Sequence, residues 1–322
     1  MPLTAEELQA RKSRVGASDV AALLGVPTFR GRNAYSLWLD KTDQLEPEDE
    51  AKKPWLRAGH RLESVVLDYA EDELGELERN IVVHDPTGAP VASTLDGQVK
   101  ASLRPVEAKT SGVFGPIHGD WGEPGGDDVP LGYLIQCETQ LLCTGVDVCH
   151  LVALLGQRGF VHYQIDPEDS LHRLIRNASQ DFFERYVTPK RDPRGEWGER
   201  LSTVHGWPVE TDPCNPDIEV VRRLRKVPGT SVAISADLVL AWAEAQKKAN
   251  DAKKYADAKK AEVLASIGTK AAGLLPDGSY VERCTERGQW QFDRDAMKRD
   301  GVLEVYGEQG TREVLRHRKA GK

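Results

Sequence analysis

The sequence lacks the marks of a membrane or secreted protein. Its apolar runs are short, and the run from Val20 to Val26 falls far below the roughly 20 residues that span a bilayer. The N-terminal segment MPLTAEELQARKSR carries charges of both signs, without the apolar stretch and cleavage site of a secretory signal. We therefore expect no membrane partner and a location in the cytoplasm.

Cysteine patterns that would define a disulfide framework or a zinc site are also missing. The chain has five cysteines, an odd number, and no CxxC pair. The even spacing of Cys137, Cys143 and Cys149 admits an iron–sulfur site, but their flanks resemble a helix and a core strand. Buried thiols are therefore the better interpretation. No histidine has the spacing of a metal ligand.

An excess of positive charge is absent as well. The formal net charge is −8, which argues against a protein that coats nucleic acid through bulk electrostatics. An enzyme that holds DNA along one local groove remains possible, because a carboxylate-rich catalytic centre contributes negative charge. The composition, 39% hydrophobic and 29% charged over 322 residues, is typical of a globular chain with one large domain and an appendage.

The periodicity of residues 1–188 predicts a mixed α/β domain. Residues 55–74 place Leu62 and Val66 at helical spacing. The period then changes to that of short strands, NIVVHD, VASTLDGQV and RPVEAKT, which predict a three-strand meander. After a 19-residue loop rich in Gly, Pro and Asp come a helix, two strands and an amphipathic helix. We expect a central mixed sheet with the meander at its heart and helices on both faces.

The remaining sequence predicts two further parts. Residues 189–230 are rich in Pro, Arg, Asp and Gly without a sustained period, which predicts a linker with one short helix. From Ser235 to Ile267 apolar residues recur by threes and fours, the pattern of a coiled-coil-like helical arm. This arm and a small β-hairpin form an accessory region over residues 231–322.

Two carboxylates and a lysine gather on neighbouring strands of the meander. Asp96 lies on one strand, and Glu107, Ala108 and Lys109 follow on the next. Alternate strand residues share a face, so Glu107 and Lys109 point the same way, and strand pairing brings Asp96 within reach. Two carboxylates and a backbone carbonyl suit Mg²⁺ or Mn²⁺. The lysine can help to deprotonate a water or stabilise the negative charge of a phosphoryl transition state, as phosphodiester hydrolysis requires.

The pattern D-x10-E-x-K also arises by chance, so its neighbours carry the interpretation. Five segments occur together: RVGASDVAALLG (14–25), RAGHRLESVVLDYA (57–70), STLDGQV (93–99), VEAKT (106–110) and YLIQCETQLL (133–142). In order and style they resemble the YqaJ-type viral recombinases, relatives of phage lambda exonuclease in the PD-(D/E)XK nuclease superfamily. The resemblance covers about residues 11–187 and implies a restriction-endonuclease-like core; the tail has no counterpart in the short lambda enzyme.

The resemblance implies roles for the acidic residues and the lysine. Asp96, Glu107 and the backbone carbonyl of Ala108 would bind metal, and Lys109 would be the catalytic lysine. Glu63 would bind or orient a second metal or its waters, so two Mg²⁺ ions per site are expected, with Mn²⁺ as the alternative. From its spacing alone, Glu63 is equally well explained as a solvated helix carboxylate.

Further positions follow from the same resemblance. Gln136 would position the lysine or the attacking water. Arg11, Ser18 and Thr94 match positions that grip the terminal 5'-phosphate of DNA in the lambda-type enzyme, and Arg14 can share that role. From the residues alone, a surface arginine and an N-cap serine explain Arg11 and Ser18 nearly as well.

The family typically resects one strand of linear duplex DNA from 5' to 3', often as a ring-shaped trimer, and hands the exposed strand to an annealing protein. We therefore expect a Mg²⁺-dependent DNA exonuclease of phage-type recombination, encoded by a phage or prophage and acting in a bacterial cytoplasm. Its expected partners are duplex DNA ends, a single-strand annealing protein and further copies of itself. Two alternatives remain: an endonuclease of repair or restriction with the same fold, and a catalytically idle DNA-binding relative.

Overall fold

The chain divides into two compact units, Met1–Lys226 and Val227–Lys322. Among the described helices, none is both long and apolar enough to cross a membrane. The computed structural model describes residues 11–27, 32–46, 54–113, 117, 119–276 and 279–282.

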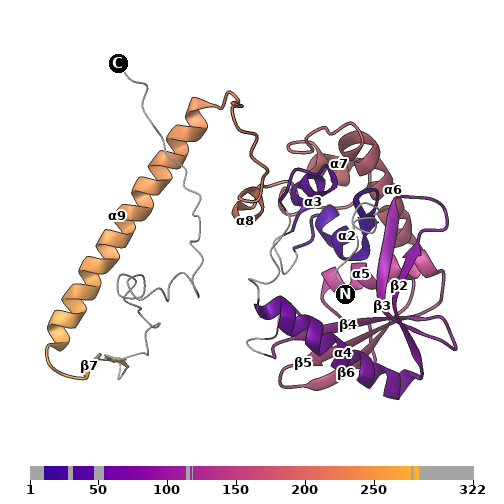
Figure 1. The fold of residues 1–322 in the computed structure, drawn as a ribbon. Coiled ribbons are helices and arrows are strands. Elements are labelled where there is room, and N and C mark those ends of the chain that lie inside the picture. The colour runs from indigo at the N-terminus through magenta and orange to yellow at the C-terminus, as the bar shows by residue number, and fades with distance from the viewer. Residues whose placement is uncertain are drawn as a thin grey trace, which may run out of the picture. The chain divides into compact units, whose positions relative to one another are not determined.

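A six-stranded mixed sheet forms the centre of the first unit, and Figure 1 shows its strands beside the labelled helices. β2, β3 and β4 are the predicted meander, with β2 and β4 both antiparallel to β3, whereas β1 pairs with β3 in parallel. β5 adds to β4 in parallel, and β6 returns antiparallel to β5. The strands are β1 (Val15–Gly16), β2 (Leu77–His84), β3 (Val91–Val99), β4 (Pro105–Ser111), β5 (Cys149–Leu155) and β6 (Gly159–Ile165).

The central strand, β3, has different neighbours on its two edges. β2 follows one edge almost from end to end, with Ala92 opposite His84 and Gly97 opposite Arg79. Ala92 also pairs with Gly16 of β1, and Gly97 also pairs with Val106 of β4. A strand residue has one neighbour on each side, so β1 and β4 share the second edge of β3.

Helices cover the sheet from both sides, because successive strand residues point to opposite faces. Val152 of β5 packs with Val66 of α4, whereas its neighbour Leu151 packs with Cys137 of α5. The predicted mixed fold is therefore confirmed. The helical elements of this unit are α2 (Ala17–Leu23), α3 (Ala34–Lys41), α4 (Pro54–Leu74), α5 (Leu131–Thr144), α6 (Asp169–Phe182), the π-helical turn η2 (Phe183–Val187), α7 (Trp197–Thr203) and α8 (Ile218–Val221).

Local sequence signals explain where the helices lie and end. On α6 the buried residues Leu171, Ile175, Ala178 and Phe182 are spaced by four, three and four, which puts them on one face of the helix. α5 ends at Gly145, whose φ of 71° is the left-handed conformation that glycine adopts without steric cost. Both helices therefore contribute apolar residues to the core of the first unit.

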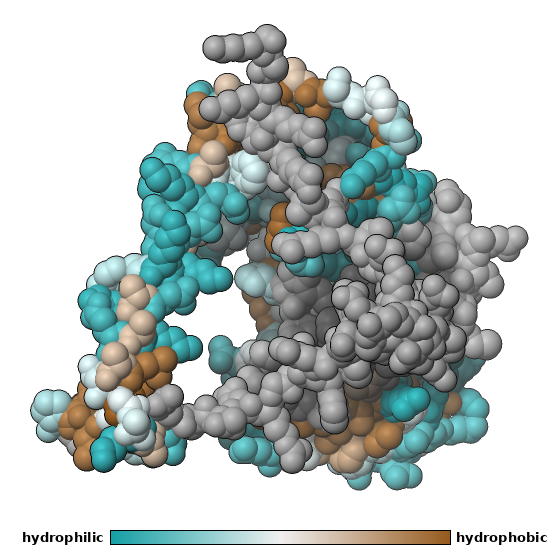
Figure 2. Space-filling view, turned by 60° about the vertical axis from the view of Figure 1, so that its left-hand side comes forward, coloured by the Kyte–Doolittle hydropathy of each residue, from teal (hydrophilic) through white to brown (hydrophobic). Residues whose placement is uncertain are grey.

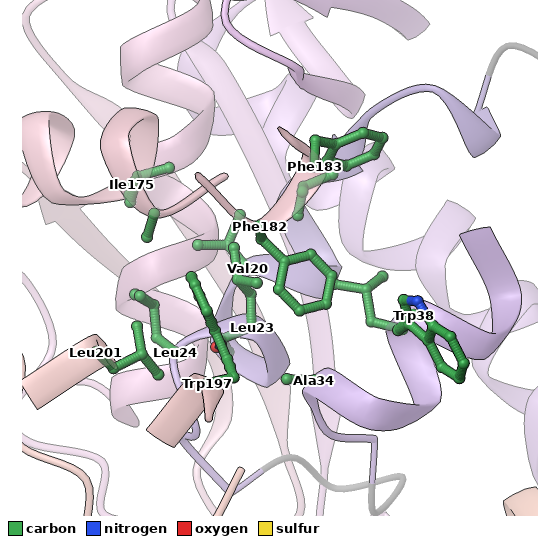
Figure 3. Packing of buried hydrophobic residues seen from close by; sticks show 14 of the residues in the cluster. Val20, Leu23, Leu24, Ala34, Trp38, Ile175, Phe182, Phe183, Trp197 and Leu201 are labelled. Carbon is green, nitrogen blue, oxygen red and sulfur yellow. The ribbon is translucent and has the colours of Figure 1, made fainter. Parts of the chain in front are cut away.

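The linker predicted at residues 189–230 is wrong for residues 189–226, which belong to the first unit. Trp197 of α7 is fully buried, and its ring lies edge-on to Phe182 with 5.0 Å between centroids. Figure 3 shows the two side chains next to each other. Trp197 Nε1 also donates a hydrogen bond to the carbonyl of Leu23, at 2.8 Å. A few buried side chains therefore anchor a segment whose composition resembles that of a linker.

The second unit contains one long helix, α9 (Ala236–Ile267), at the position that the spacing of threes and fours predicted. A short hairpin follows, in which β7 (Ala272–Leu274) pairs with β8 (Tyr280–Glu282). The rest of the predicted accessory region, residues 283–322, lies outside the described residues. Figure 2 shows hydrophilic colour along most of α9 and hydrophobic colour toward its ends, where Leu238, Leu240, Val263 and Leu264 are exposed.

Candidate active site

An interruption in the pairing of β3 positions the candidate site. β1 and β4 leave residues 93–96 of β3 between them, without a strand neighbour on that edge among the described residues. We call this stretch the β3 gap; at about 3.3 Å per residue it is roughly 13 Å long. Thr94 and Asp96 alternate with the buried Leu95 and so share one face of the strand. The gap therefore exposes Thr94 and carries Asp96 toward β4.

The side chain of Asp96 lies where β3 and β4 separate. Over their described residues these strands pair only at Gly97–Val106 and Gln98–Pro105, and the same register would continue with Asp96 opposite Glu107. Instead, the backbone N–H of Ala108 donates to Asp96 Oδ2 at 2.9 Å. The carboxylate thus takes the place of a strand partner, which holds it beside Glu107.

The carboxylate of Glu107 accepts more side-chain hydrogen bonds than any other group of the site. The residue is only 1% exposed, on the face of β4 that α5 covers. Its Oε1 accepts hydrogen bonds from Lys109 Nζ and, at 2.6 Å, from Gln136 Nε2. Its Oε2 accepts from Gln140 Nε2. The structure therefore brings Asp96, Glu107, Lys109 and Gln136 together, as the sequence predicted.

The side chain of Lys109, the candidate catalytic lysine, contacts the carboxylate of Glu107 and the aromatic ring of Tyr133. Lys109 Nζ pairs with Glu107 and lies 5.3 Å from the centre of the Tyr133 ring on α5. Tyr133 packs in turn against Trp121, a buried residue of the loop before α5, with ring centres 5.5 Å apart. The glycine-rich loop therefore contacts the site through Trp121, which packs against Tyr133 beside Lys109.

Burial and mutual charge shift the pKa values of all three groups. Burial, followed by the charge of Asp96, raises the pKa of Glu107 to about 7 against the opposing effect of Lys109. Burial also raises the pKa of Asp96, and Glu63 adds to that rise while Lys109 opposes it. Burial would lower the pKa of Lys109, but the charges of Glu107 and Asp96 outweigh it and raise that pKa. The site is an electrostatically coupled cluster.

Gln140 is a site residue that the sequence analysis missed. It lies one helical turn after Gln136, so both amides project from the same face of α5 toward Glu107. The repeated Gln at a spacing of four on the predicted helix was the available signal. It was overlooked because a helix-surface amide is unremarkable until the partner strand is known.

The donors present suit a hard divalent cation. Asp96 and Glu107 lie close enough to share a hydrogen bond, and a cation between two buried carboxylates would relieve their repulsion. Among the described residues, however, no three His, Cys, Asp or Glu side chains are grouped to hold a metal ion. Glu63 is near enough to affect Asp96, but its carboxylate lies 3.8 Å from His60 Nδ1 and is 37% exposed. Its metal-binding role and that of the Ala108 carbonyl stay predictions.

Three of the predicted 5'-phosphate residues lie around the β1 side of the β3 gap. Thr94 is exposed on the gap itself, and Ser18 is exposed in the first turn of α2, just after β1. Arg14 precedes β1 and hydrogen-bonds through Nη1 to Nδ1 of His84, at 2.9 Å. The N-cap of α2 is Gly16, so the alternative interpretation of Ser18 as an N-cap is wrong.

Arg11 has a different environment. Its backbone carbonyl accepts a hydrogen bond from Lys41 Nζ at 2.8 Å. Burial would raise the pKa of Asp19, but Arg32, Lys41 and Arg11 outweigh that effect and lower it. Arg11 therefore belongs to a basic cluster around a buried carboxylate, and its contact with a 5'-phosphate stays a prediction.

The comparisons with known proteins agree with the resemblance found in the sequence. Residues 8–147 match the sequence model of a family described as the YqaJ-like viral recombinase domain, which confirms the predicted resemblance. This range includes the whole β3 gap, the candidate catalytic residues and Gln140. Comparison with curated proteins gave no match.

Similar solved structures include two exonucleases from bacteria. An alkaline exonuclease from Laribacter hongkongensis is 20% identical, with a TM-score of 0.44 over 62% of this chain and 100% of that chain. A phage related exonuclease from Haemophilus somnus 129PT is 13% identical, with a TM-score of 0.38 over 55% of this chain and 96% of that chain.

Proposed function

We propose that the first unit is a divalent-metal-dependent deoxyribonuclease that degrades linear duplex DNA from its ends. The observation that carries this proposal is the meeting of Asp96, Glu107, Lys109 and Gln136 at the β3 gap. The match to the viral recombinase domain supports DNA as the substrate and recombination as the process. The finer assignment, resection from 5' to 3' in phage-type recombination, follows from the resemblance of the five sequence segments.

Each residue has a chemical task in this proposal. Asp96 and Glu107, with the Ala108 carbonyl and Glu63, would hold one or two Mg²⁺ ions, for which Mn²⁺ is the alternative. A bound divalent ion supplies Lewis acidity at the scissile phosphate. Lys109 places a positive charge beside the phosphate, where it stabilises the additional negative charge of the transition state. Gln136 orients Glu107 and Lys109, because Gln136 Nε2 and Lys109 Nζ both donate hydrogen bonds to Glu107 Oε1.

The end of the DNA would be held at the opposite side of the gap. Ser18 and Thr94 offer hydroxyl groups and Arg14 a guanidinium group, which are common ligands of phosphate. Because β1 and β4 flank the same four-residue gap, the end of β1 and the start of the pairing with β4 are separated by roughly the 13 Å length of the gap, and Thr94 lies between them, about 7 Å along the strand from Asp96. A terminal 5'-phosphate at one side and a nearby phosphodiester at the other would fit this spacing.

The first experiment uses three substrates. Linear duplex with 5'-phosphates, the same duplex without them and a covalently closed circle are each incubated with Mg²⁺ and with chelator. We expect Mg²⁺-dependent loss of the phosphorylated linear duplex. Lys109→Ala should slow it by about 10²–10³-fold, because it removes one preorganised positive group. Lys100→Ala, at an exposed lysine paired with Glu76, is the control and should retain activity.

The same experiment distinguishes the alternatives. Cleavage of the closed circle would support an endonuclease instead, because a circle has no ends. If none of the three substrates is degraded in a metal-dependent way, the result would support a catalytically idle DNA-binding relative.

The resemblance also supports proposals about partners and location. We infer that the protein forms a homo-oligomer, with a trimer as the expected state, and passes single strands to an annealing protein in the bacterial cytoplasm. Sedimentation of the full chain tests the first point, and a monomer at micromolar concentration would contradict it.

A further inference from the structure

Gln140 connects the carboxylate of Glu107 to the core of the first unit. The residue is fully buried, and its Nε2 donates to Glu107 Oε2. On its other side, Gln140 Oε1 accepts from the thiol of Cys149 on β5, at 3.4 Å. Both partners are themselves buried. The buried amide therefore contacts Glu107 through its nitrogen and Cys149 through its oxygen.

This arrangement fixes the orientation of the amide. When Glu107 is ionised, as a metal ligand must be, its carboxylate only accepts hydrogen bonds, so it requires the amide nitrogen of Gln140 on its side. The Cys149 thiol then faces the amide oxygen, to which it can donate. A flipped amide would place two oxygens against each other at Glu107 and leave its buried N–H groups facing sulfur, which is unfavourable.

Consequently, the two oxygens of Glu107 are not equivalent. Oε1 lies on the side of Lys109 and Gln136, both of which are partly exposed. Oε2 is directed into the core, where the fully buried Gln140 occupies it. A cation at Oε1 would displace or share partners that are partly exposed, whereas at Oε2 it would have to displace the fully buried Gln140.

We propose that Gln140 is a specificity-determining positioning residue that limits Glu107 to one metal-binding oxygen and so favours Mg²⁺ over Ca²⁺. The inference rests on the proposed role of Glu107 as a metal ligand. Mg²⁺ requires six ligands in nearly ideal octahedral geometry at about 2.0–2.1 Å; it keeps several waters among them, so one oxygen from a carboxylate is enough. Ca²⁺ takes about 6–8 oxygen ligands at longer distances and often binds both oxygens of a carboxylate. A carboxylate with one oxygen engaged by the core disfavours the larger ion.

Metal titration calorimetry on the full chain tests this inference without relying on activity. The dissociation constants of Mg²⁺ and Ca²⁺ are measured for the wild type and for Gln140→Met, which keeps the length of the side chain but removes the donor. The expected result is a fall of about tenfold in the preference for Mg²⁺ over Ca²⁺, in the range found when metal-site supporting residues are replaced. Gln136→Met, the matched control at Oε1, should change both affinities in the same direction and leave their ratio near that of the wild type.

Substitutions at Cys149 provide an independent test that leaves Gln140 in place. Cys149→Ser retains a donor to Gln140 Oε1 and should keep the wild-type ratio of affinities. Cys149→Ala removes that donor, lets the amide turn and should lower the ratio. If Gln140→Met fails to fold, equal ratios for Cys149→Ala and Cys149→Ser overturn the inference.

A parallel nuclease assay of the wild type separates this inference from the proposed function. A wild type that cleaves DNA with Mg²⁺, together with an unchanged affinity ratio in Gln140→Met, overturns the role of Gln140 alone. A wild type that binds neither ion overturns both the inference and the proposed metal-dependent activity.

Discussion

Replacement of Trp197 by alanine should strongly destabilise the first unit. The residue is fully buried in α7, and its ring packs edge-on against Phe182 and Tyr186, with centroid distances of 5.0 and 5.8 Å. Large-to-small changes of a buried Trp cost about 3–5 kcal/mol. The carbonyl of Leu23 also loses the donor Nε1, which adds about 1 kcal/mol. Against a total of about 5–15 kcal/mol for a typical domain, Trp197→Ala removes a large fraction of the stability.

Urea unfolding of the full chain, followed by near-ultraviolet circular dichroism, measures this loss. Trp197→Phe keeps an aromatic ring but not the hydrogen bond and should have an intermediate stability. Val204→Ala, at a 56% exposed position immediately after α7, is the matched control and should lie within about 0.5 kcal/mol of the wild type. A loss below 1 kcal/mol for Trp197→Ala would refute the conclusion that residues 189–226 help to form the core of the first unit.

Two further predictions concern charge. Burial would raise the pKa of Asp85, but hydrogen bonds from Arg176 and Thr87 outweigh it and lower that pKa. Ionised Asp85 therefore stabilises the fold above its unfolded pKa of about 4, and this contribution disappears as the pH falls through the lower folded pKa. Asp85→Asn should cost about 2 kcal/mol at pH 7 and less at pH 3 in urea unfolding, and a loss independent of pH would contradict this assignment. Arg14→Ala should raise the KM for 5'-phosphorylated duplex severalfold relative to unphosphorylated duplex in steady-state assays; an equal change for both would rule out a contact with the end phosphate.

The sequence predicted the cluster of Asp96, Glu107 and Lys109 because these residues lie close together along the chain. Asp96, Glu107 and Lys109 lie within two adjacent strands, and the alternation of strand side chains places the last two on one face before any tertiary contact is known. Gln136 required the family resemblance, since nothing in its helix says which strand it will face. Gln140 was missed for the same reason, although its spacing from Gln136 is regular.

The error at residues 189–226 has a different cause. Periodicity detects long amphipathic elements, but α7 and α8 are only seven and four residues long. Their anchoring depends on single side chains such as Trp197 and Val220, which enter a core built by helices far earlier in the chain. A fully buried Trp contributes as much apolar area as several smaller residues, so one such residue outweighs the polar composition around it.

The β3 gap explains why these residues form a site instead of an ordinary sheet. Continued pairing of β3 with β4 would put Asp96 and Glu107 opposite each other on a closed ladder, where like charges in direct opposition are destabilising. Because pairing stops at Gly97, the Asp96 carboxylate turns to the Ala108 N–H, and β1 occupies the same edge only four residues earlier. An open strand edge is usually a liability for aggregation, and here it is short and flanked by strands at both ends. The interruption therefore costs a few backbone hydrogen bonds and leaves an edge of β3 without a strand partner, among the described residues, beside both carboxylates.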